Sequence, residues 1–184
     1  MNQKISKADE LFFVVDEHDQ PLKPLPRKLV HGYGVWHRVS HIWLQNDKGQ
    51  LLCQQRSFEK ELYPGFWECF FGGHIRPNET YEQAAIRELD EELGVEVNAK
   101  DLYLWRVYKF FDKAEGYNNE FMGVFVARWN GKLEDLVFDD GEVARAAWKD
   151  IPEIKQEIVE NGGKGWTSIG YELQLLDELG LRAT

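Results

Sequence analysis

The sequence has few cysteines and no surplus of positive charge. Its 184 residues include only Cys53 and Cys69, which we expect to form neither a metal-binding pair nor a disulfide framework. Lys and Arg number 22 against 32 Asp and Glu, which gives a formal net charge of −10. Binding to a DNA or RNA backbone requires clustered Lys and Arg, so we expect no nucleic acid polymer as partner. A small phosphate ligand stays compatible, because a metal ion can reverse the charge of one cleft.

Membrane and export signals are also missing. No apolar run approaches the roughly 20 residues of a membrane-spanning helix, and residues 1–10 are too polar for a signal peptide. We therefore expect no membrane partner, and a reducing cytoplasm is the default location.

The sequence does contain enough apolar material for a core. Hydrophobic residues make up 43% of the chain and aromatic residues 14%. No repeat, low-complexity tract or clear linker divides it, and its length suits one domain. We predict a single α+β domain over residues 1–184.

Apolar alternation and turn residues predict the order of the elements. A short strand within residues 10–20 runs into an Asp-rich turn, and residues 21–26 form a proline-punctuated connector. Strands are predicted in 36–45, 51–56, 63–73, 101–111 and 120–129, with the turn at 46–49 joining the first two. A last strand and a helix that ends near Gly162 follow. A C-terminal helix is predicted at about residues 166–180.

The best-defined helix follows two glycines. Thr80 and Gln83 match a capping box, which predicts that the helix begins at Tyr81. Gly94 fits a left-handed stop at its end. At about 100° per residue, one arc of the helix is apolar and suited to the core. That arc comprises Ala85, Ile86, Leu89 and Leu93.

Three carboxylates share another face of this helix. Glu88 repels Glu91 and Glu92 at the i,i+3 and i,i+4 spacings, by about 0.2–0.5 kcal/mol per pair. The last turn also carries the negative end of the helix dipole. A solvated acidic face is one interpretation. Because locally unfavourable residues often mark functional sites, the other is a site for Mg²⁺ or Mn²⁺, which prefer carboxylate oxygens.

The residues before the helix favour the metal interpretation. Gly72 and Gly73 let the backbone approach a ligand closely and can direct a carbonyl at a metal. Glu79 and Arg87 are suited to pair and to brace the loop against the helix. Together these features predict a cradle for a metal ion with phosphates.

This stretch resembles the Nudix box, the pattern G-x5-E-x7-R-E-U-x-E-E-x-G-U in which U is aliphatic. The box covers residues 73–95, and the similar strand pattern extends over about residues 12–154. Every specified position is filled, by Gly73, Glu79, Arg87, Glu88, Leu89, Glu91, Glu92, Gly94 and Val95.

The resemblance implies the Nudix α/β/α sandwich, with a mixed sheet between helices. It also implies hydrolysis of a diphosphate linked to another moiety, by water that attacks phosphorus. Arg87 and Glu79 would orient the helix. The ligands of Mg²⁺ or Mn²⁺ would be Glu88, Glu91, Glu92 and the backbone carbonyl of Gly73.

Such metal ions neutralise developing charge on phosphate oxygens and lower the pKa of a bound water, whose proton a nearby carboxylate can accept. Glu120 and Glu142 are both placed at strand beginnings and are candidates for a metal or base role, although either could be a plain surface residue. We assign catalysis to Glu91, Glu92, Arg87 and Glu120.

A narrower resemblance is to the Nudix branch that contains isopentenyl-diphosphate isomerase and its hydrolase relatives. In the isomerases a second metal site uses histidines and acids. The corresponding residues here are His31, His37, His74 and Glu120. The isomerase cysteine would align with Gly72, whereas Cys69 lies three residues earlier and faces the other side of the sheet. Asn118 stands near a further expected acid. These departures favour hydrolysis over isomerisation.

Arg56 and Lys60 follow a hairpin strand and are suited to contact substrate phosphates, and the relatives carry an Arg and a Lys in the same segment. We predict substrate binding by Arg56, Lys60 and His74, against the alternative of surface solvation. Cys69 is not assigned as a nucleophile, because no positioned base is visible beside it.

Three functions therefore stay open: a metal-dependent diphosphate hydrolase, an isomerase of an allylic diphosphate, and a catalytically silent binding module on the same fold. The complete set of acids favours the hydrolase. Its partner would be a small-molecule diphosphate, and a homodimer is the assembly that the family suggests.

Overall fold

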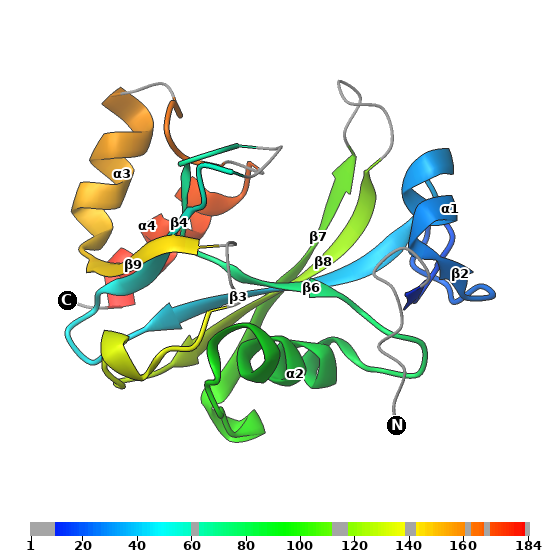
Figure 1. The fold of residues 1–184 in the computed structure, drawn as a ribbon, viewed down its shortest axis with the longest axis horizontal. Helices are drawn as coiled ribbons and strands as arrows, with labels where there is room; N and C mark the ends of the chain where they lie inside the picture. Colours follow the sequence, from blue (N-terminus) through cyan, green and yellow to red (C-terminus); the bar gives the residue numbers. More distant parts are fainter. Residues whose placement is uncertain are drawn as a thin grey trace.

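The computed structural model describes residues 10–59, 63–111, 118–138, 143–160, 163–167 and 170–182. A seven-stranded mixed sheet runs through it, and helices lie on both faces of the sheet (Figure 1). The strands of this sheet are β3 (His37–Gln45), β4 (Leu51–Arg56), β5 (Trp67–Glu68), β6 (Phe71–His74), β7 (Leu102–Phe111), β8 (Asn119–Arg128) and β9 (Val143–Lys149). A small second sheet pairs β1 (Leu11–Phe12) with β2 (Leu25–Pro26). The helices are α1 (Arg27–Tyr33), α2 (Tyr81–Leu93), α3 (Ile151–Glu160) and α4 (Glu172–Arg182), with short 3₁₀ helices at Ala99–Asp101 and Leu133–Asp135.

Strand β3 is the centre of the sheet. It runs parallel to β8, with His37 opposite Glu120 at one end of the pairing. It runs antiparallel to β6, with Val39 opposite His74. These two registers bring His37, Glu120 and His74 to the same end of β3. Strand β4 meets β3 only at Gln45 and then pairs with β5 and β9.

Alternating side chains of β3 build a core on each face of the sheet, as expected for a strand covered on both sides. Val39 and Trp43 point to the face covered by α3 and α4, where Ile154 and Leu175 pack. The opposite face is covered by α2. Its core includes Ile42, Leu44, Phe125, Ala85, Leu89 and Leu93. The predicted α/β/α arrangement of an α+β chain is therefore confirmed.

The predicted bounds of α2 are also confirmed. The Thr80 hydroxyl accepts a hydrogen bond from the Gln83 backbone N–H, the Gln83 side chain accepts one from the Thr80 N–H, and Gly94 ends the helix with φ 65°. The buried arc differs slightly from the prediction, because Ala84 and Glu88 are buried whereas Ile86 is only partly so. Glu88 is therefore turned towards the protein, while Glu91 stays exposed.

Helix α1 follows the predicted connector 21–26 and lies in residues for which no element was predicted. One predicted boundary was wrong. The C-terminal helix begins at Glu172 instead of about residue 166, because Trp166 forms a parallel bridge with Trp67 and so continues the sheet. Among the residues that the structure describes, no helix is both long and apolar enough to span a membrane.

A polar group is buried between the sheet and α4. His41 on β3 stacks on Phe70 with ring centroids 4.2 Å apart, and its Nδ1 lies 3.0 Å from the Tyr171 hydroxyl. Trp43 donates its indole N–H to the same hydroxyl at 3.3 Å. Burial lowers the pKa of His41 to about 4, so the ring is neutral in the folded protein at neutral pH.

We expect His41 to make the protein less stable in mild acid. The pKa of His41 is depressed on folding, so its contribution is fully present above the unfolded-state pKa of about 6.5 and is lost as pH falls towards about 4. In urea titrations between pH 7 and 4, wild type should lose more unfolding free energy than His41→Asn, by on the order of 1–3 kcal/mol. His18→Asn, which removes an exposed histidine, is the matched control. Identical pH slopes for wild type and His41→Asn would contradict this role.

Candidate active site

The glycines of β6 allow α2 to approach the strand closely. Gly72 has φ +133°, and a Cβ there would lie 2.0 Å from the Ser40 carbonyl oxygen. A Cβ on Gly73 would lie 3.0 Å from the Glu88 carboxylate. The Gly72 N–H donates a hydrogen bond of 3.0 Å to Glu92. The predicted metal ligands of α2 and the backbone at Gly73 therefore lie against each other.

The three acids differ in their environment. Glu88 is 9% exposed, and burial raises its pKa although Arg87 opposes the shift. The Glu91 side chain is 45% exposed. Glu92 is held at the glycine corner by the hydrogen bond from Gly72. A buried, an exposed and a backbone-anchored carboxylate thus meet at one end of α2.

Arg87 connects the acids to the loop before the helix. Its Nε and Nη2 lie 2.7 and 2.9 Å from the two Glu79 oxygens, which confirms the predicted pair. Its Nη1 lies 2.6 Å from Glu88 and 3.1 Å from Glu91. The last two contacts were not predicted from the sequence. The long Arg side chain folds across the helix surface to reach both.

A second arginine, Arg76, also holds Glu91. Its two terminal nitrogens make parallel contacts of 3.1 and 3.0 Å with the two carboxylate oxygens. This ion pair was not predicted from the sequence. Arg76 and Arg87 offset part of the repulsion among the acids, so a divalent cation that binds Glu91 shares or displaces their contacts with it.

Beside this carboxylate site lies a cluster of three histidines. His31 of α1, His37 of β3 and His74 of β6 each offer a ring nitrogen, and these atoms all lie within 4.8 Å of one another. The Nε2 atom of each has no hydrogen-bond partner among the described residues. Phe12 stacks on His74 with centroids 3.8 Å apart. Such convergent, unsatisfied imidazole nitrogens fit a metal ion.

The protonation states in the cluster suit ligation. Burial, with His37 and Arg27 nearby, lowers the pKa of His31 to about 4 and that of His74 well below its usual range. His37 Nδ1 lies 2.9 Å from the Val35 carbonyl, an arrangement in which Nδ1–H donates and Nε2 keeps its lone pair. Neutral rings with available lone pairs are what metal ligation requires.

Glu120 belongs to the histidine cluster. Its carboxylate lies 3.6 Å from His37 Nε2 and accepts a 2.7 Å hydrogen bond from the Asn118 side chain. Burial acts to raise the pKa of Glu120, but His37, His41 and Asn118 together outweigh burial, so the pKa is lowered. Glu120 is therefore a buried carboxylate at the histidines, and the described contacts do not link it to Glu88, Glu91 or Glu92.

The histidine cluster and the carboxylate site share strand β6. The His74 carbonyl accepts a hydrogen bond of 3.1 Å from Arg87, and His74 follows Gly73 directly. Arg56 of β4, a predicted substrate residue, contacts Glu68 of β5 at 3.3 Å. Lys60 and Glu142 lie outside the described residues.

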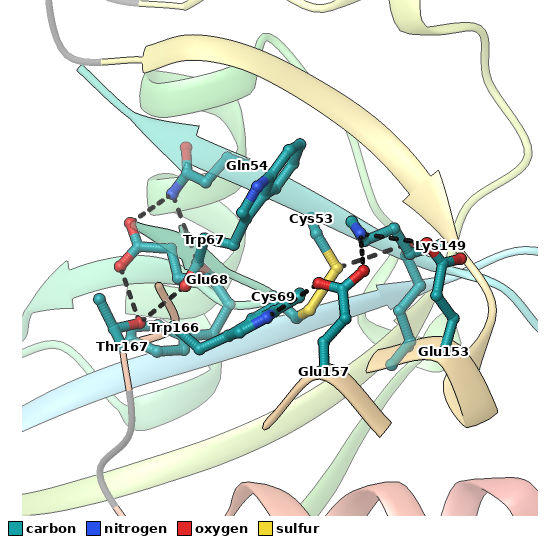
Figure 2. The surroundings of a disulfide bond; sticks show 12 residues. Cys53, Gln54, Trp67, Glu68, Cys69, Lys149, Glu153, Glu157, Trp166 and Thr167 are labelled. Carbon is teal, nitrogen blue, oxygen red and sulfur yellow. Dashed lines mark hydrogen bonds and ion pairs between the residues drawn. A yellow bond between two sulfur atoms is a disulfide. The ribbon is translucent and has the colours of Figure 1, made fainter. Parts of the chain in front are cut away.

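The two cysteines form a disulfide, which corrects the prediction that they would not. The antiparallel pairing of β4 with β5 places Gln54 opposite Glu68, and so brings Cys53 opposite Cys69 (Figure 2). A spacing of 16 residues reveals nothing of this register. The bond leaves no free cysteine. It also counts against the expected cytoplasmic location, where disulfides are rare.

Several residues that the Nudix box did not predict also take part in the two sites. Arg76, Asn118 and Phe12 each hold a site side chain, through an ion pair, a hydrogen bond and ring stacking respectively. Arg76 is the one with a sequence signal, since it stands in the loop of the box itself. Asn118 lies two residues before Glu120, and Phe12 comes from β1, far along the chain from His74.

Comparison with known proteins agrees with this geometry. The family model for the NUDIX domain matches residues 35–167. The chain belongs to the Nudix family. An uncharacterized Nudix hydrolase of Pseudomonas aeruginosa is 37% identical over 127 residues, which cover 69% of this chain and 72% of that protein. An isopentenyl-diphosphate Delta-isomerase of Paenarthrobacter aurescens is 35% identical over 143 residues, 77% of this chain and 76% of the isomerase.

Solved structures show the same Nudix fold. A crystal structure of a Deinococcus radiodurans protein covers 92% of this chain and 99% of its own, with TM-score 0.66 and 26% identity. The match to the NUDIX domain of Shewanella oneidensis NrtR, complexed with ADP ribose, covers 80% of this chain and 88% of that domain, with a TM-score of 0.57 at 17% identity. Nudix hydrolases generally use divalent metal ions and act on small molecules.

We expect the disulfide to contribute to stability. Reduction with a dithiol should lower the unfolding free energy by about 3 kcal/mol, because the bond restricts the unfolded chain. The effect is smaller than that of disulfides that close larger loops, since this bond joins residues only 16 apart. The Cys53→Ser/Cys69→Ser variant should show no response to the reductant. A thiol assay in denaturant should detect no thiol before reduction and two thiols after it. Two reactive thiols in the unreduced protein would contradict the bond.

Proposed function

We propose that this Nudix protein is a metal-dependent hydrolase that cleaves a diphosphate linkage in a small molecule. The observation that carries the proposal is the meeting of Glu88 and Glu92 with the glycine corner at Gly72 and Gly73, with Glu91 joined to Glu88 through Arg87. Hard cations such as Mg²⁺ or Mn²⁺ prefer this set of carboxylate and carbonyl oxygens.

The role that we assign to each residue of the site follows from its environment. Bound divalent ions supply neutralisation of phosphate charge and a water of lowered pKa. Glu88 and Glu92, with the Gly73 carbonyl, would hold the ions. Glu91 is the most exposed of the acids and would accept the water proton. Arg87 holds Glu88 and Glu91 through contacts of 2.6 and 3.1 Å, and two contacts with Glu79 hold Arg87 itself.

We also propose that the histidine cluster binds a second metal ion. The support is the convergence of His31, His37 and His74 with three unsatisfied Nε2 atoms, next to Glu120. Imidazole ligands favour a transition metal such as Mn²⁺ or Zn²⁺ over Mg²⁺. Because β6 carries both His74 and Gly73, such an ion would stabilise the strand from which the carboxylate site is built.

Isomerisation of an allylic diphosphate is the second candidate, since relatives with that name share 31–35% identity with the chain. The residue aligned with their cysteine is Gly72, whose Cβ would collide with the Ser40 carbonyl. Cys69 is occupied in the disulfide. These observations favour hydrolysis. The diphosphate substrate, a homodimer, a cytoplasmic location and a single domain over residues 1–184 stay predictions.

The test of hydrolysis is a phosphate-release screen. The panel should hold nucleotide sugars, dinucleotides, nucleoside triphosphates and prenyl diphosphates, each with Mg²⁺ and with Mn²⁺. On the best substrate, Glu91→Gln and Glu92→Gln should each lower kcat at least about 100-fold, because each removes a ligand or base. Glu82→Gln, on the exposed first turn of the same helix, is the matched control. Unchanged kcat in both site variants would sink the assignment.

The second metal site predicts a separate class of bound Mn²⁺. Bound metal is first removed with a chelator, and the protein is then titrated with Mn²⁺ while electron paramagnetic resonance measures the free ion. The titration should show a class of bound Mn²⁺ that is absent in His31→Gln and still present in Glu92→Gln. His18→Gln should bind as wild type does. Equal Mn²⁺ stoichiometry in wild type and His31→Gln would show that the histidines bind no ion.

A further inference from the structure

Glu68 is a buried carboxylate that the proposed mechanism does not use. It lies on β5 and is only 6% exposed. Burial raises its pKa, which means that the surroundings only partly compensate the loss of water around the charge. A carboxylate kept in such a place is an unfavourable local choice, and such choices tend to have a functional reason.

Among the described residues, three side chains contact the Glu68 carboxylate. Gln54 donates to Oε1 at 3.0 Å, and the Thr167 hydroxyl lies 3.4 Å from Oε2 (Figure 2). Arg56 Nη1 lies 3.3 and 3.4 Å from the two oxygens. The Arg56 side chain is 23% exposed against 7% for that of Glu68. The acid therefore holds the guanidinium from its buried side.

The backbone around Glu68 is fixed from both sides. Strand pairing sets Gln54 opposite Glu68, and the next residue, Cys69, is bonded to Cys53. On the other edge of β5, Trp67 donates its N–H to the Gly165 carbonyl at 2.8 Å and accepts from Thr167 at 2.9 Å. A carboxylate on so restrained a strand gives Arg56 a well-defined direction.

The same strand leads to the carboxylate site. Beyond Cys69 the chain enters β6, where Gly72 binds Glu92. Glu68 contacts Arg56 of β4, and it lies on the same stretch of chain that continues into the glycine corner of β6. Arg56 is also the residue assigned to contact substrate phosphates.

We propose that Glu68 is a positioning residue that holds the Arg56 guanidinium in place for the diphosphate of the substrate. This rests on the proposed function, in which Arg56 binds that diphosphate. The competing explanation is purely structural: Glu68 anchors residues 163–167 to β5 through Thr167. The two explanations differ in what they predict for substrate binding.

The experiment compares Glu68→Gln with wild type. Glutamine keeps the size and an oxygen that accepts from Gln54, but it loses the charge that holds Arg56. KM for the diphosphate substrate should rise on the order of tenfold, as for loss of a hydrogen bond to a charged group, while kcat stays within about twofold of wild type. Affinity for methylenediphosphonate, which cannot be hydrolysed, should fall by a similar factor in calorimetry with Mg²⁺.

Controls separate positioning from stability. Glu153→Gln removes an exposed carboxylate that pairs with Lys149 at 3.3 Å, and it should leave KM unchanged. Thr167→Val removes the contact to residues 163–167, and the positioning role predicts unchanged KM for it. Glu68 and Arg56 should also be coupled, so that adding Glu68→Gln to Arg56→Gln changes KM no further. Should Glu68→Gln not fold, Glu68→Asp keeps the charge but retracts it from Arg56, and its KM should rise with kcat retained.

The outcomes distinguish the two proposals. A lower melting temperature with unchanged KM and analogue affinity would overturn the positioning role and leave Glu68 as an anchor. Additive effects of Glu68→Gln and Arg56→Gln would also overturn it. A wild-type protein that hydrolyses no diphosphate would overturn the proposed function, and the analogue titrations would then decide whether Glu68 and Arg56 serve binding alone.

Discussion

The close approach of α2 to β6 is the constraint on which the rest of the structure depends. Two glycines leave no side chain between helix and strand, so the Gly72 N–H reaches Glu92 and the Gly73 backbone touches Glu88. With any larger residue at Gly72, the strand would collide with the Ser40 carbonyl. The carboxylates can then face a backbone carbonyl, which is the arrangement that a hard divalent cation uses.

Electrostatic balance in the site comes first from arginines. Arg87 reaches Glu79, Glu88 and Glu91, and Arg76 grips Glu91 with two nitrogens. An exposed ion pair of this kind contributes little to stability, about 0–1 kcal/mol. Arg76 therefore opposes a doubly charged ion only weakly, while the buried Arg87 keeps the helix and its loop together. The arginines therefore position the acids but leave them able to bind a divalent ion.

Strand pairing explains how distant residues complete the site. Because β3 lies between β8 and β6, it brings His37 next to Glu120 and near His74, and α1 adds His31. The pairing of β4 with β5 likewise produces the Cys53–Cys69 bond and the contact between Arg56 and Glu68. In each group at least one residue belongs to the run from β5 to β6: His74 in the first group, and Glu68 and Cys69 in the second.

The parts that sequence predicts are those that local interactions determine. The capping box at Thr80, the stop at Gly94 and the pair of Glu79 with Arg87 involve residues within one short stretch, and the structure confirms all three. The disulfide and the histidine–Glu120 contact depend on strand register, which one sequence does not reveal. The resemblance to relatives supplied the histidines, but it did not supply Arg76, whose contact with Glu91 depends on how the loop folds back.

The central claim is that divalent ions bind between the α2 carboxylates and the glycine corner. Anomalous diffraction from crystals grown with Mn²⁺ and methylenediphosphonate tests it most directly. The account predicts an anomalous peak within bonding distance of Glu88, Glu92 and the Gly73 carbonyl, with the diphosphonate on the far side of the metal. An empty site there, with Arg76 still bound to both oxygens of Glu91, would contradict it.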